Sequence, residues 1–278
     1  MLVFLNGKFV PEEKAVISVF DRGFLYGDGL FETIRVFNGR PFRWREHLRR
    51  LEAGAEFLKI KLTYSPDHLL ALAAELVRKN NLPDSLLRIS FSRGVGSPGY
   101  SPKDARAPTL VMSLRPARNP KNLPQWKLIT ASIRVPANDP LACFKTSNKL
   151  PQVLARAEAD AAGADEALLV NTSGFVAEGT SSNVFWVKRG AIHTPPISAG
   201  ILPGVTRVVV FEIAAGLGIR VHEKNIRPNE LAKAEGVFLS LTSLGVVEAI
   251  QLDGAGLKGS ELTGRIRHAY QLKMNDES

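Results

Sequence analysis

A lone lysine in an uncharged stretch is the first residue of this sequence that could do covalent chemistry. Lys145 lies within residues 140–148 (PLACFKTSN), which contain no other charged side chain. Apolar surroundings remove water from an ammonium group and lower its pKa, so that the neutral amine can attack a carbonyl and form a Schiff base. A lysine on an exposed loop would show the same pattern. The stretch alone leaves both interpretations open.

Two further segments carry polar groups where chemistry could use them. Glu178 lies between an apolar stretch and a turn rich in glycine and serine, where a half-buried carboxylate needs a cationic partner. Residues 200–206 precede an expected helix, whose free N–H groups could hold a phosphate together with the Thr206 hydroxyl. An ordinary helix cap also explains this loop and, from the loop alone, is the preferred interpretation.

Several other kinds of site lack support in the sequence. The five histidines lie far apart, without the spacing of a zinc hydrolase, and no serine lies in a G-x-S-x-G turn. Residues 94–99 match the G-x-G-x-x-G dinucleotide pattern, but the nearby prolines 98, 102 and 108 prevent the helix that this motif requires. The single cysteine, Cys143, excludes a disulfide framework and is expected to be a packing group. We therefore expect no metal site.

The elements that must position these residues are a mixture of hairpin strands and separate helices. Asn6-Gly7 predicts a hairpin between strands at 2–5 and 8–10, and a strand at 30–37 follows a loop at 21–29. Periodicity and capping residues predict helices at 46–59, 66–80, 149–162, 205–217 and 229–234, and after residue 260. Further strands are expected at 86–92, 109–114, 127–135, 236–241 and 246–251. This order favours an α+β fold over an alternating parallel sheet.

The length of 278 residues suggests two domains. Prolines 116, 120 and 124 stiffen the segment 115–125, which is the best linker candidate. We expect a small N-terminal α+β domain over 1–117, a linker over 118–125 and a larger α/β domain over 126–278 that contains Lys145.

Composition restricts the class of protein. A hydrophobic fraction of 45% with 23% charged residues is typical of a folded globular chain, and no apolar run reaches the ~20 residues of a membrane-spanning helix. The N-terminus lacks the pattern of a signal peptide, so we expect a cytoplasmic protein without a membrane partner. The net charge of +9 includes five arginines within residues 40–50. They could contact phosphate or form a solvated helix face, but no nucleic-acid-binding motif accompanies them. A non-catalytic basic binding protein remains the remote alternative.

Five segments together resemble the class IV family of pyridoxal-phosphate enzymes, which contains branched-chain and D-amino-acid aminotransferases. In chain order they are DRGFLYGDGLFETIR at 21–35, HLRRL at 47–51, KTSNKL at 145–150, EGTSSNVF at 178–185 and GILPGVTR at 200–207. The resemblance extends over nearly the whole chain. It implies the two-domain fold of this family, pyridoxal 5'-phosphate held between the domains, and a homodimer.

The resemblance also implies roles for individual residues. Lys145 would bind the cofactor covalently and then move the substrate proton, while Glu178 would face the pyridine nitrogen and keep the ring an electron sink. Arg50 would bind the cofactor phosphate. The other phosphate contacts implied by the family are Val205, Thr206 and Thr242.

The members of the family differ in their substrate-binding residues. D-amino-acid enzymes carry tyrosine where Phe31 stands, and branched-chain enzymes usually carry glycine where Thr33 stands. Aminodeoxychorismate lyases commonly have this threonine and a loop like SRGVGSPGYS at 92–101, although Pro98 replaces their usual arginine. We expect an aminotransferase acting on an amino donor and a 2-oxo acid. The alternative is 4-amino-4-deoxychorismate lyase, which releases pyruvate and p-aminobenzoate. The candidate substrate-binding residues are Phe31, Thr33, Arg35, Arg93 and Tyr100.

Overall fold

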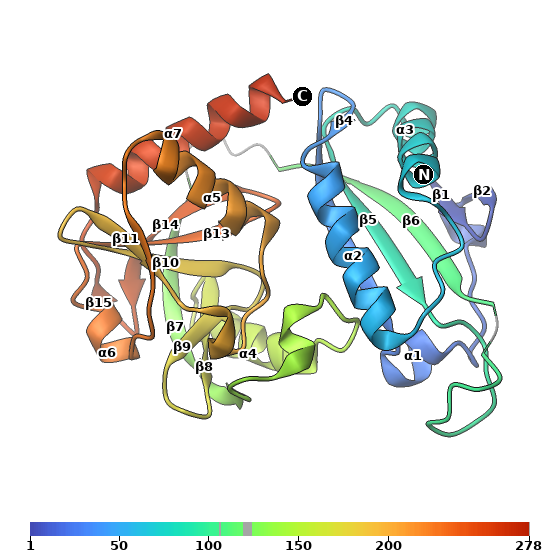
Figure 1. The fold of residues 1–278 in the computed structure, drawn as a ribbon, viewed down its shortest axis with the longest axis horizontal. Coiled ribbons are helices and arrows are strands. Elements are labelled where there is room, and N and C mark those ends of the chain that lie inside the picture. Colours follow the sequence, from blue (N-terminus) through green and yellow to red (C-terminus); the bar gives the residue numbers. More distant parts are fainter. Residues whose placement is uncertain (106, 119–123, 278) are drawn as a thin grey trace. The chain divides into compact units, whose positions relative to one another are not determined.

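The computed structural model describes residues 1–105, 107–118 and 124–277. It divides into two compact units (Figure 1). The first comprises Met1–Ala117 together with Phe144–Asn148 and the end of the chain, and the second comprises Arg118–Cys143 and Lys149–Asp276. Most of the expected linker, residues 119–123, lies outside the described residues. The short segment that carries Lys145 belongs to the first unit, whereas the sequence assigned it to the second domain.

The first unit is built on a six-stranded antiparallel sheet in the order β2-β1-β6-β5-β3-β4. The strands are β1 (Leu2–Leu5), β2 (Lys8–Pro11), β3 (Gly29–Phe37), β4 (Arg40–Pro41), β5 (Ser85–Ser92) and β6 (Thr109–Pro116). The hairpin predicted at Asn6-Gly7 is present, because both turn residues adopt the positive φ that they tolerate. A short helix, α1 (Arg22–Tyr26), lies within the expected loop at 21–29 and was not predicted.

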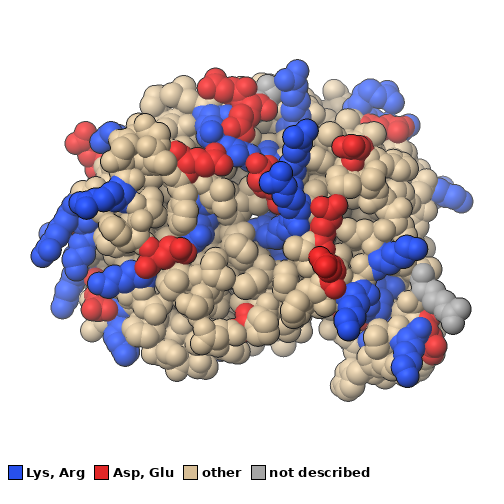
Figure 2. Space-filling view, viewed as in Figure 1, with Lys and Arg blue, Asp and Glu red and all other residues tan. Residues whose placement is uncertain are grey.

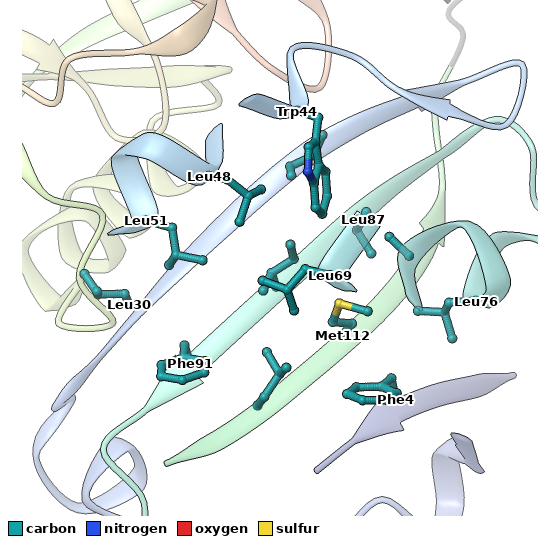
Figure 3. Close-up of a cluster of buried hydrophobic side chains, with 14 of the residues drawn as sticks. Phe4, Leu30, Trp44, Leu48, Leu51, Leu69, Leu76, Leu87, Phe91 and Met112 are labelled. Atoms are coloured by element: carbon teal, nitrogen blue, oxygen red, sulfur yellow. The ribbon is translucent and has the colours of Figure 1, made fainter. Parts of the chain in front are cut away.

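Two helices cover one face of this sheet. They are α2 (Trp44–Leu58) and α3 (Pro66–Asn80), both close to their predicted ranges. Ser65 caps α3 by accepting a hydrogen bond from the His68 N–H, and Pro66 occupies the first helical position. Apolar side chains from the helices and from alternate strand positions form the core (Figure 3). Phe4, Leu48, Leu76, Leu87 and Met112 are among its fully buried members.

The second unit is built on a nine-stranded mixed sheet in the order β12-β11-β10-β13-β14-β7-β8-β9, with β15 paired to β14. The strands are β7 (Gln125–Val135), β8 (Glu166–Asn171), β9 (Val176–Gly179), β10 (Asn183–Lys188), β11 (Ala191–Thr194), β12 (Val221–Glu223), β13 (Gly236–Leu241), β14 (Gly245–Leu252) and β15 (Ala255–Gly256). Strands β8 and β13 are buried along their whole length, as expected of strands covered on both faces.

The helices of the second unit are α4 (Leu150–Ala161), α5 (Val205–Gly216), α6 (Pro228–Leu231) and α7 (Glu261–Asp276). Helix α4 packs on β7 and β8, while α5 and α7 pack on the central strands and on each other. None of the helices over the described ranges is long and apolar enough to cross a membrane. Helices and sheets together confirm the α+β class.

Candidate active site

The segment Phe144–Asn148 is joined to β3 by main-chain hydrogen bonds. The Phe31 N–H donates to the Lys145 carbonyl at 2.9 Å, and the Ser147 N–H donates to the Gly29 carbonyl at 2.8 Å. Gly29 also pairs with β5 on its other side, where a Cβ would lie 2.6 Å from the Phe91 carbonyl oxygen, which explains the glycine. Backbone pairing therefore fixes Lys145 at the edge of the first unit's sheet.

The Lys145 side chain is half-buried and lies against an aromatic ring. Its Nζ is 4.5 Å from the centre of the Phe31 ring, and Phe31 itself is buried. On the other side of the segment, Phe144 packs on Phe57 with ring centres 4.6 Å apart. An aromatic ring therefore lies against the amine of this lysine, and a second aromatic pair packs at the residue before it.

A buried charged group lies between β3 and α2. Arg50 donates from Nε and one terminal nitrogen to the two carboxylate oxygens of Glu32, at 2.8 and 2.7 Å. His47 Nδ1 lies 2.7 Å from the same carboxylate. Burial alone would raise the pKa of Glu32, but hydrogen bonds and positive charge from Arg50 and His47 lower it, from 4.5 to about 2. Glu32 is therefore charged and orients Arg50 through a bidentate pair.

His47 is neutral in this environment. Burial lowers its pKa; the Glu32 carboxylate acts in the opposite direction, and the positive charges of Arg50 and Lys145 lower the pKa further. A neutral imidazole has one N–H, and the short contact to Glu32 places it on Nδ1. The electrostatic effect of Lys145 on His47 also shows that the lysine and the Glu32–His47–Arg50 group share one region of the first unit.

The opposite face of the same sheet is rich in arginine. Thr33 and Arg35 of β3 alternate with the core residues and face away from α2. Arg35 is buried and its guanidinium lies 3.5 Å from a carboxylate oxygen of Asp84. Arg88 of β5 is directly opposite Thr33, and its guanidinium lies 3.8 Å above the centre of the Phe31 ring. A carboxylate substrate would meet a positive surface here.

Arg88 was not among the residues expected from the sequence. Its position follows from the strand pairing of β5 with β3, in which positions 33 and 88 are partners. The alternation of apolar residues along 85–92 already places Arg88 on the face away from the core. The register that brings it to Phe31 is a long-range feature, which the local pattern does not contain.

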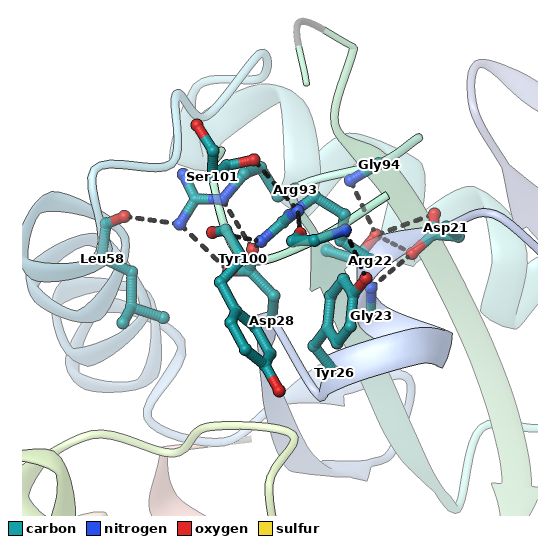
Figure 4. A network of polar contacts seen from close by, with 12 residues as sticks. Asp21, Arg22, Gly23, Tyr26, Asp28, Leu58, Arg93, Gly94, Tyr100 and Ser101 are labelled. Carbon is teal, nitrogen blue, oxygen red and sulfur yellow. Dashed lines mark hydrogen bonds and ion pairs between the residues drawn. The ribbon is translucent and has the colours of Figure 1, made fainter. Parts of the chain in front are cut away.

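The glycine-rich loop at 94–101 is held by α1 (Figure 4). Arg22 donates to the carbonyl oxygens of Gly99, Tyr100 and Ser101 at 2.9, 3.0 and 3.2 Å. The Tyr100 side chain is 87% exposed and lies beside Tyr26. The described residues that follow these glycines, 100–105 and 107–108, form no helix, in agreement with the rejection of a dinucleotide motif. The arginine, which is itself buried, fixes the path of the loop.

Arg93 holds the base of this loop. It forms a bidentate pair with Asp28 at 2.8 and 3.0 Å and donates to the carbonyl oxygens of Leu58 and Lys59 (Figure 4). These contacts use all three guanidinium nitrogens. Four of the five N–H groups are used, so a substrate carboxylate could form a bidentate pair only by displacing one of these contacts, and Arg93 is better placed to fix the loop than to bind substrate.

In the second unit, Glu178 is held at the loop that leads into α5. Its carboxylate accepts hydrogen bonds from the Leu202 N–H at 3.0 Å and from Asn183 Nδ2 at 3.3 Å. Asn183 also donates to the Leu202 carbonyl at 2.9 Å. A Cβ at Gly204 would lie 2.1 Å from the Asn183 amide oxygen, which explains the glycine. The half-buried Glu178 is therefore fixed in one orientation.

A second carboxylate, Glu166, shapes the turn between Glu178 and Asn183. Glu166 is fully buried in β8. It accepts hydrogen bonds from the hydroxyl and N–H of Thr180, and from the hydroxyls of Ser181 and Ser182. Glu166 was not among the residues expected from the sequence, although a glutamate at the start of the apolar stretch EALLV is a visible signal. Its role is to position the turn.

The N-terminus of α5 offers free backbone donors. Gly204 is the N-cap residue and supplies no side-chain cap, and Val205 and Thr206 are buried. Amides at an uncapped helix N-terminus suit an anion. Thr242 begins the turn after β13, two residues beyond Ser240, which pairs with Asn183 of β10. The described part of the chain contains no group of histidine, cysteine, aspartate and glutamate that could hold a metal ion.

Comparison with known proteins shows which family the chain resembles. Residues 29–252 match the family model for amino-transferase class IV. A putative branched-chain-amino-acid aminotransferase of Methanocaldococcus jannaschii is 37% identical over 99% of this chain and 96% of its own length. A D-alanine aminotransferase of Staphylococcus aureus is 35% identical over 99% of both chains. The aminodeoxychorismate lyase of Bacillus subtilis is 30% identical over 99% of this chain and 95% of its own length.

The fold agrees as well. The branched-chain aminotransferase of the archaeon Thermoproteus uzoniensis, solved with norvaline, superposes with a TM-score of 0.90 at 30% identity, covering 100% of this chain and 96% of that one. The family match covers most of the sequence, and the buried Glu32–His47–Arg50 group, Lys145 and Glu178 all lie within it. This chain belongs to the class IV aminotransferase family.

Proposed function

We propose that the protein is a pyridoxal-phosphate-dependent aminotransferase that transfers an amino group between an amino acid or amine and a 2-oxo acid. The observation that carries the proposal is the placement of the Lys145 amine 4.5 Å from the Phe31 ring, in the same unit as the Glu32–His47–Arg50 group. An amine against an apolar ring is suited to bind a carbonyl and to exchange protons. The similarity to named aminotransferases supports the same reaction.

The side chains present fit the proposed cofactor. Arg50 and the amides of Val205 and Thr206 supply donors for a phosphate, and Glu178 supplies a fixed carboxylate for a protonated ring nitrogen. When bound, the cofactor supplies an electron sink for negative charge at the substrate α-carbon. We propose that these residues of both units, with Thr242, serve one cofactor molecule.

The chain's own residues then have distinct tasks. Lys145 would use its Nζ, which lies against the Phe31 ring, to take the proton from the substrate α-carbon and pass it on. Phe31 and Thr33 provide the surface beside the reacting atoms, and Arg35 and Arg88 provide positive charge for a carboxylate. Glu178, held by Leu202 and Asn183, would accept a hydrogen bond from a protonated ring nitrogen.

Covalent attachment tests the role of Lys145. Reduction of the holoenzyme with borohydride should fix a pyridoxyl group on Lys145, identified by peptide mass spectrometry. Lys145→Ala should abolish the adduct and lower the transamination rate by at least about a thousandfold. Lys149→Ala, which removes a lysine four residues away, should retain both. An adduct and full activity in the Lys145→Ala protein would refute the assignment.

The lyase is the second candidate function. It is favoured by the similarity to the Bacillus subtilis lyase and by the loop at 92–101, which Arg22 holds in place. Incubation with D-amino acids, branched-chain L-amino acids or (R)-amines plus 2-oxoglutarate should yield glutamate if the protein is an aminotransferase. Release of p-aminobenzoate from aminodeoxychorismate, without glutamate formation from any donor, would establish the lyase instead.

We further propose that the protein acts as a homodimer in the cytoplasm. The first unit exposes several large apolar side chains around α1, which a second copy would cover. The lone cysteine, Cys143, is free, which suits a reducing compartment.

A further inference from the structure

The second unit contains a cavity of about 680 Å³ at the β12 edge of its sheet. One wall comes from the ends of β10, β11 and β12, and the other from residues 224–235, which include α6. This volume lies within the range of small-molecule sites. None of the residues proposed to hold the cofactor lines the cavity, so the cavity is not part of that proposed site.

The lining is strongly basic. Five cationic side chains line the cavity, namely Lys188, Arg189, Arg220, Lys224 and Lys233. The two acidic residues of the lining, Glu230 and Glu235, leave a net of three positive charges. Lysine and arginine side chains gather at the left of the view in Figure 2, where β11 and α6 lie in Figure 1.

Both carboxylates of the lining are already engaged by the backbone. Glu235 accepts two hydrogen bonds from the Arg189 N–H, at 2.9 and 3.0 Å. Glu230 accepts one from the Arg227 N–H at 3.0 Å and caps α6. Within the described residues, none of the five cations of the lining forms an ion pair with a carboxylate. The five cations outnumber the two carboxylates of the lining and repel one another, and a bound anion would relieve this repulsion.

The cavity also has a wall of stacked rings. The rings of Trp186 and His193 lie 5.5 Å apart at 16°, and those of His193 and His222 lie 5.1 Å apart at 29°. Burial lowers the pKa of His193, and the charges of His222, Lys224 and Lys188 lower it further, so this ring is neutral at pH 7. His222 lies in β12 between Arg220 and Lys224, so the ring stack stands beside two of the lining cations.

We propose that this cavity is a second ligand site, which binds a small polyanion of the oligophosphate class through the five unpaired cations. A phosphate chain with three or more negative charges matches the net charge of the lining, and each phosphate offers several acceptors to arginine and lysine donors. A free oligophosphate and a nucleoside triphosphate share this chemistry.

Calorimetry with the holoenzyme tests the site, since saturating pyridoxal phosphate keeps its own phosphate subsite filled. Tripolyphosphate should bind the wild type at low salt with one site per chain. The double substitution Arg220→Ala with Lys224→Ala should weaken binding by at least about tenfold, because it removes two charged donors. The control, Lys258→Ala with Arg265→Ala, removes the same charge from exposed positions outside the lining and should change affinity less than about twofold.

Three results would overturn the proposal: no binding by the wild type, equal weakening in both double variants, or equal affinity for citrate, a polyanion without phosphate. Comparison of tripolyphosphate with ATP separates the two sources. Tighter binding of ATP identifies a nucleotide that also uses the ring stack, whereas equal binding identifies the phosphate chain alone. Transaminase activity is not the readout, so failure here is independent of the proposed function.

Discussion

Glu32 is a buried carboxylate whose pKa is lowered by Arg50 and His47. Its pKa is lowered from 4.5 to about 2 in the folded protein, so its contribution to stability is present above pH 4.5 and is lost as the pH falls toward 2. The shift corresponds to roughly 3 kcal/mol. We expect Glu32→Gln to lower the free energy of unfolding by this order at pH 7, and the difference from wild type to shrink between pH 4.5 and 2.

Urea unfolding at pH 7 and at pH 3 measures this difference. Glu56→Gln, an exposed substitution on α2, should unfold like the wild type at both pH values. His47 also makes the protein less stable as the pH falls. Its pKa is lower in the folded protein than in the unfolded chain, so protonation at acidic pH favours the unfolded state. A Glu32→Gln deficit of the same size at both pH values would show that packing, and not the charge of the carboxylate, is responsible.

Glu166 acts on Glu178 through the turn at Thr180–Ser182. Replacement of Glu166 by glutamine exchanges an acceptor oxygen for an NH2 group that faces hydroxyl and N–H donors, so at least one buried hydrogen bond is lost. We expect Glu166→Gln to lower the free energy of unfolding by about 1–3 kcal/mol and to weaken pyridoxal phosphate binding, because Glu178 loses its fixed position. Asp253→Asn, which removes a more exposed carboxylate that binds Thr130, serves as the control for both measurements. Unchanged cofactor affinity in a destabilised Glu166→Gln protein would limit Glu166 to a structural role.

At the scale of elements, local signals identified most helices and strands. Ser65-Pro66 marked the start of α3, and Asn6-Gly7 marked the first hairpin, because capping and turn chemistry act between neighbouring residues. The pairing of Phe144–Asn148 with β3, and the ion pair of Glu32 with Arg50, join residues far apart in the chain or on different elements. No local pattern encodes such contacts, so the sequence assigned Lys145 to the second domain.

Gly29 connects β3, β5 and the lysine segment. A Cβ at this position would lie 2.6 Å from the Phe91 carbonyl oxygen. The backbone of β3 cannot move away from it without disturbing the main-chain hydrogen bonds to β5 and to the lysine segment. We expect Gly29→Ala to lower the melting temperature and to reduce borohydride-trapped cofactor on Lys145. The control is Gly264→Ala in α7, where a Cβ meets nothing and better helix propensity should raise stability by up to about 1 kcal/mol. Full trapping in Gly29→Ala would show that the pairing does not position the lysine.

At the scale of the whole molecule, the exposed apolar surface around α1 predicts self-association. Phe24 of α1 is 68% exposed, Phe20 just before it is exposed, and Val95 pairs with Asp21 through an isolated bridge. Arg22 of the same helix donates a hydrogen bond to the Tyr100 carbonyl, so exposed apolar residues of α1 and of the loop at 94–101 are held by one set of contacts. Such surfaces on soluble chains are usually covered by a partner, and a second copy of this chain fits the proposed homodimer.

A charge in the middle of this surface should therefore dissociate the dimer. Phe24→Asp places a carboxylate where apolar contact is expected, and desolvating it without a partner opposes association. Light scattering coupled to gel filtration should show wild-type dimers and Phe24→Asp monomers at micromolar concentration. Leu272→Asp, which adds the same charge at an exposed leucine of α7, should remain dimeric. Arg22 holds the loop at 94–101 beside this surface. Loss of transaminase activity in the folded Phe24→Asp monomer would therefore show that this loop depends on the second copy for its function.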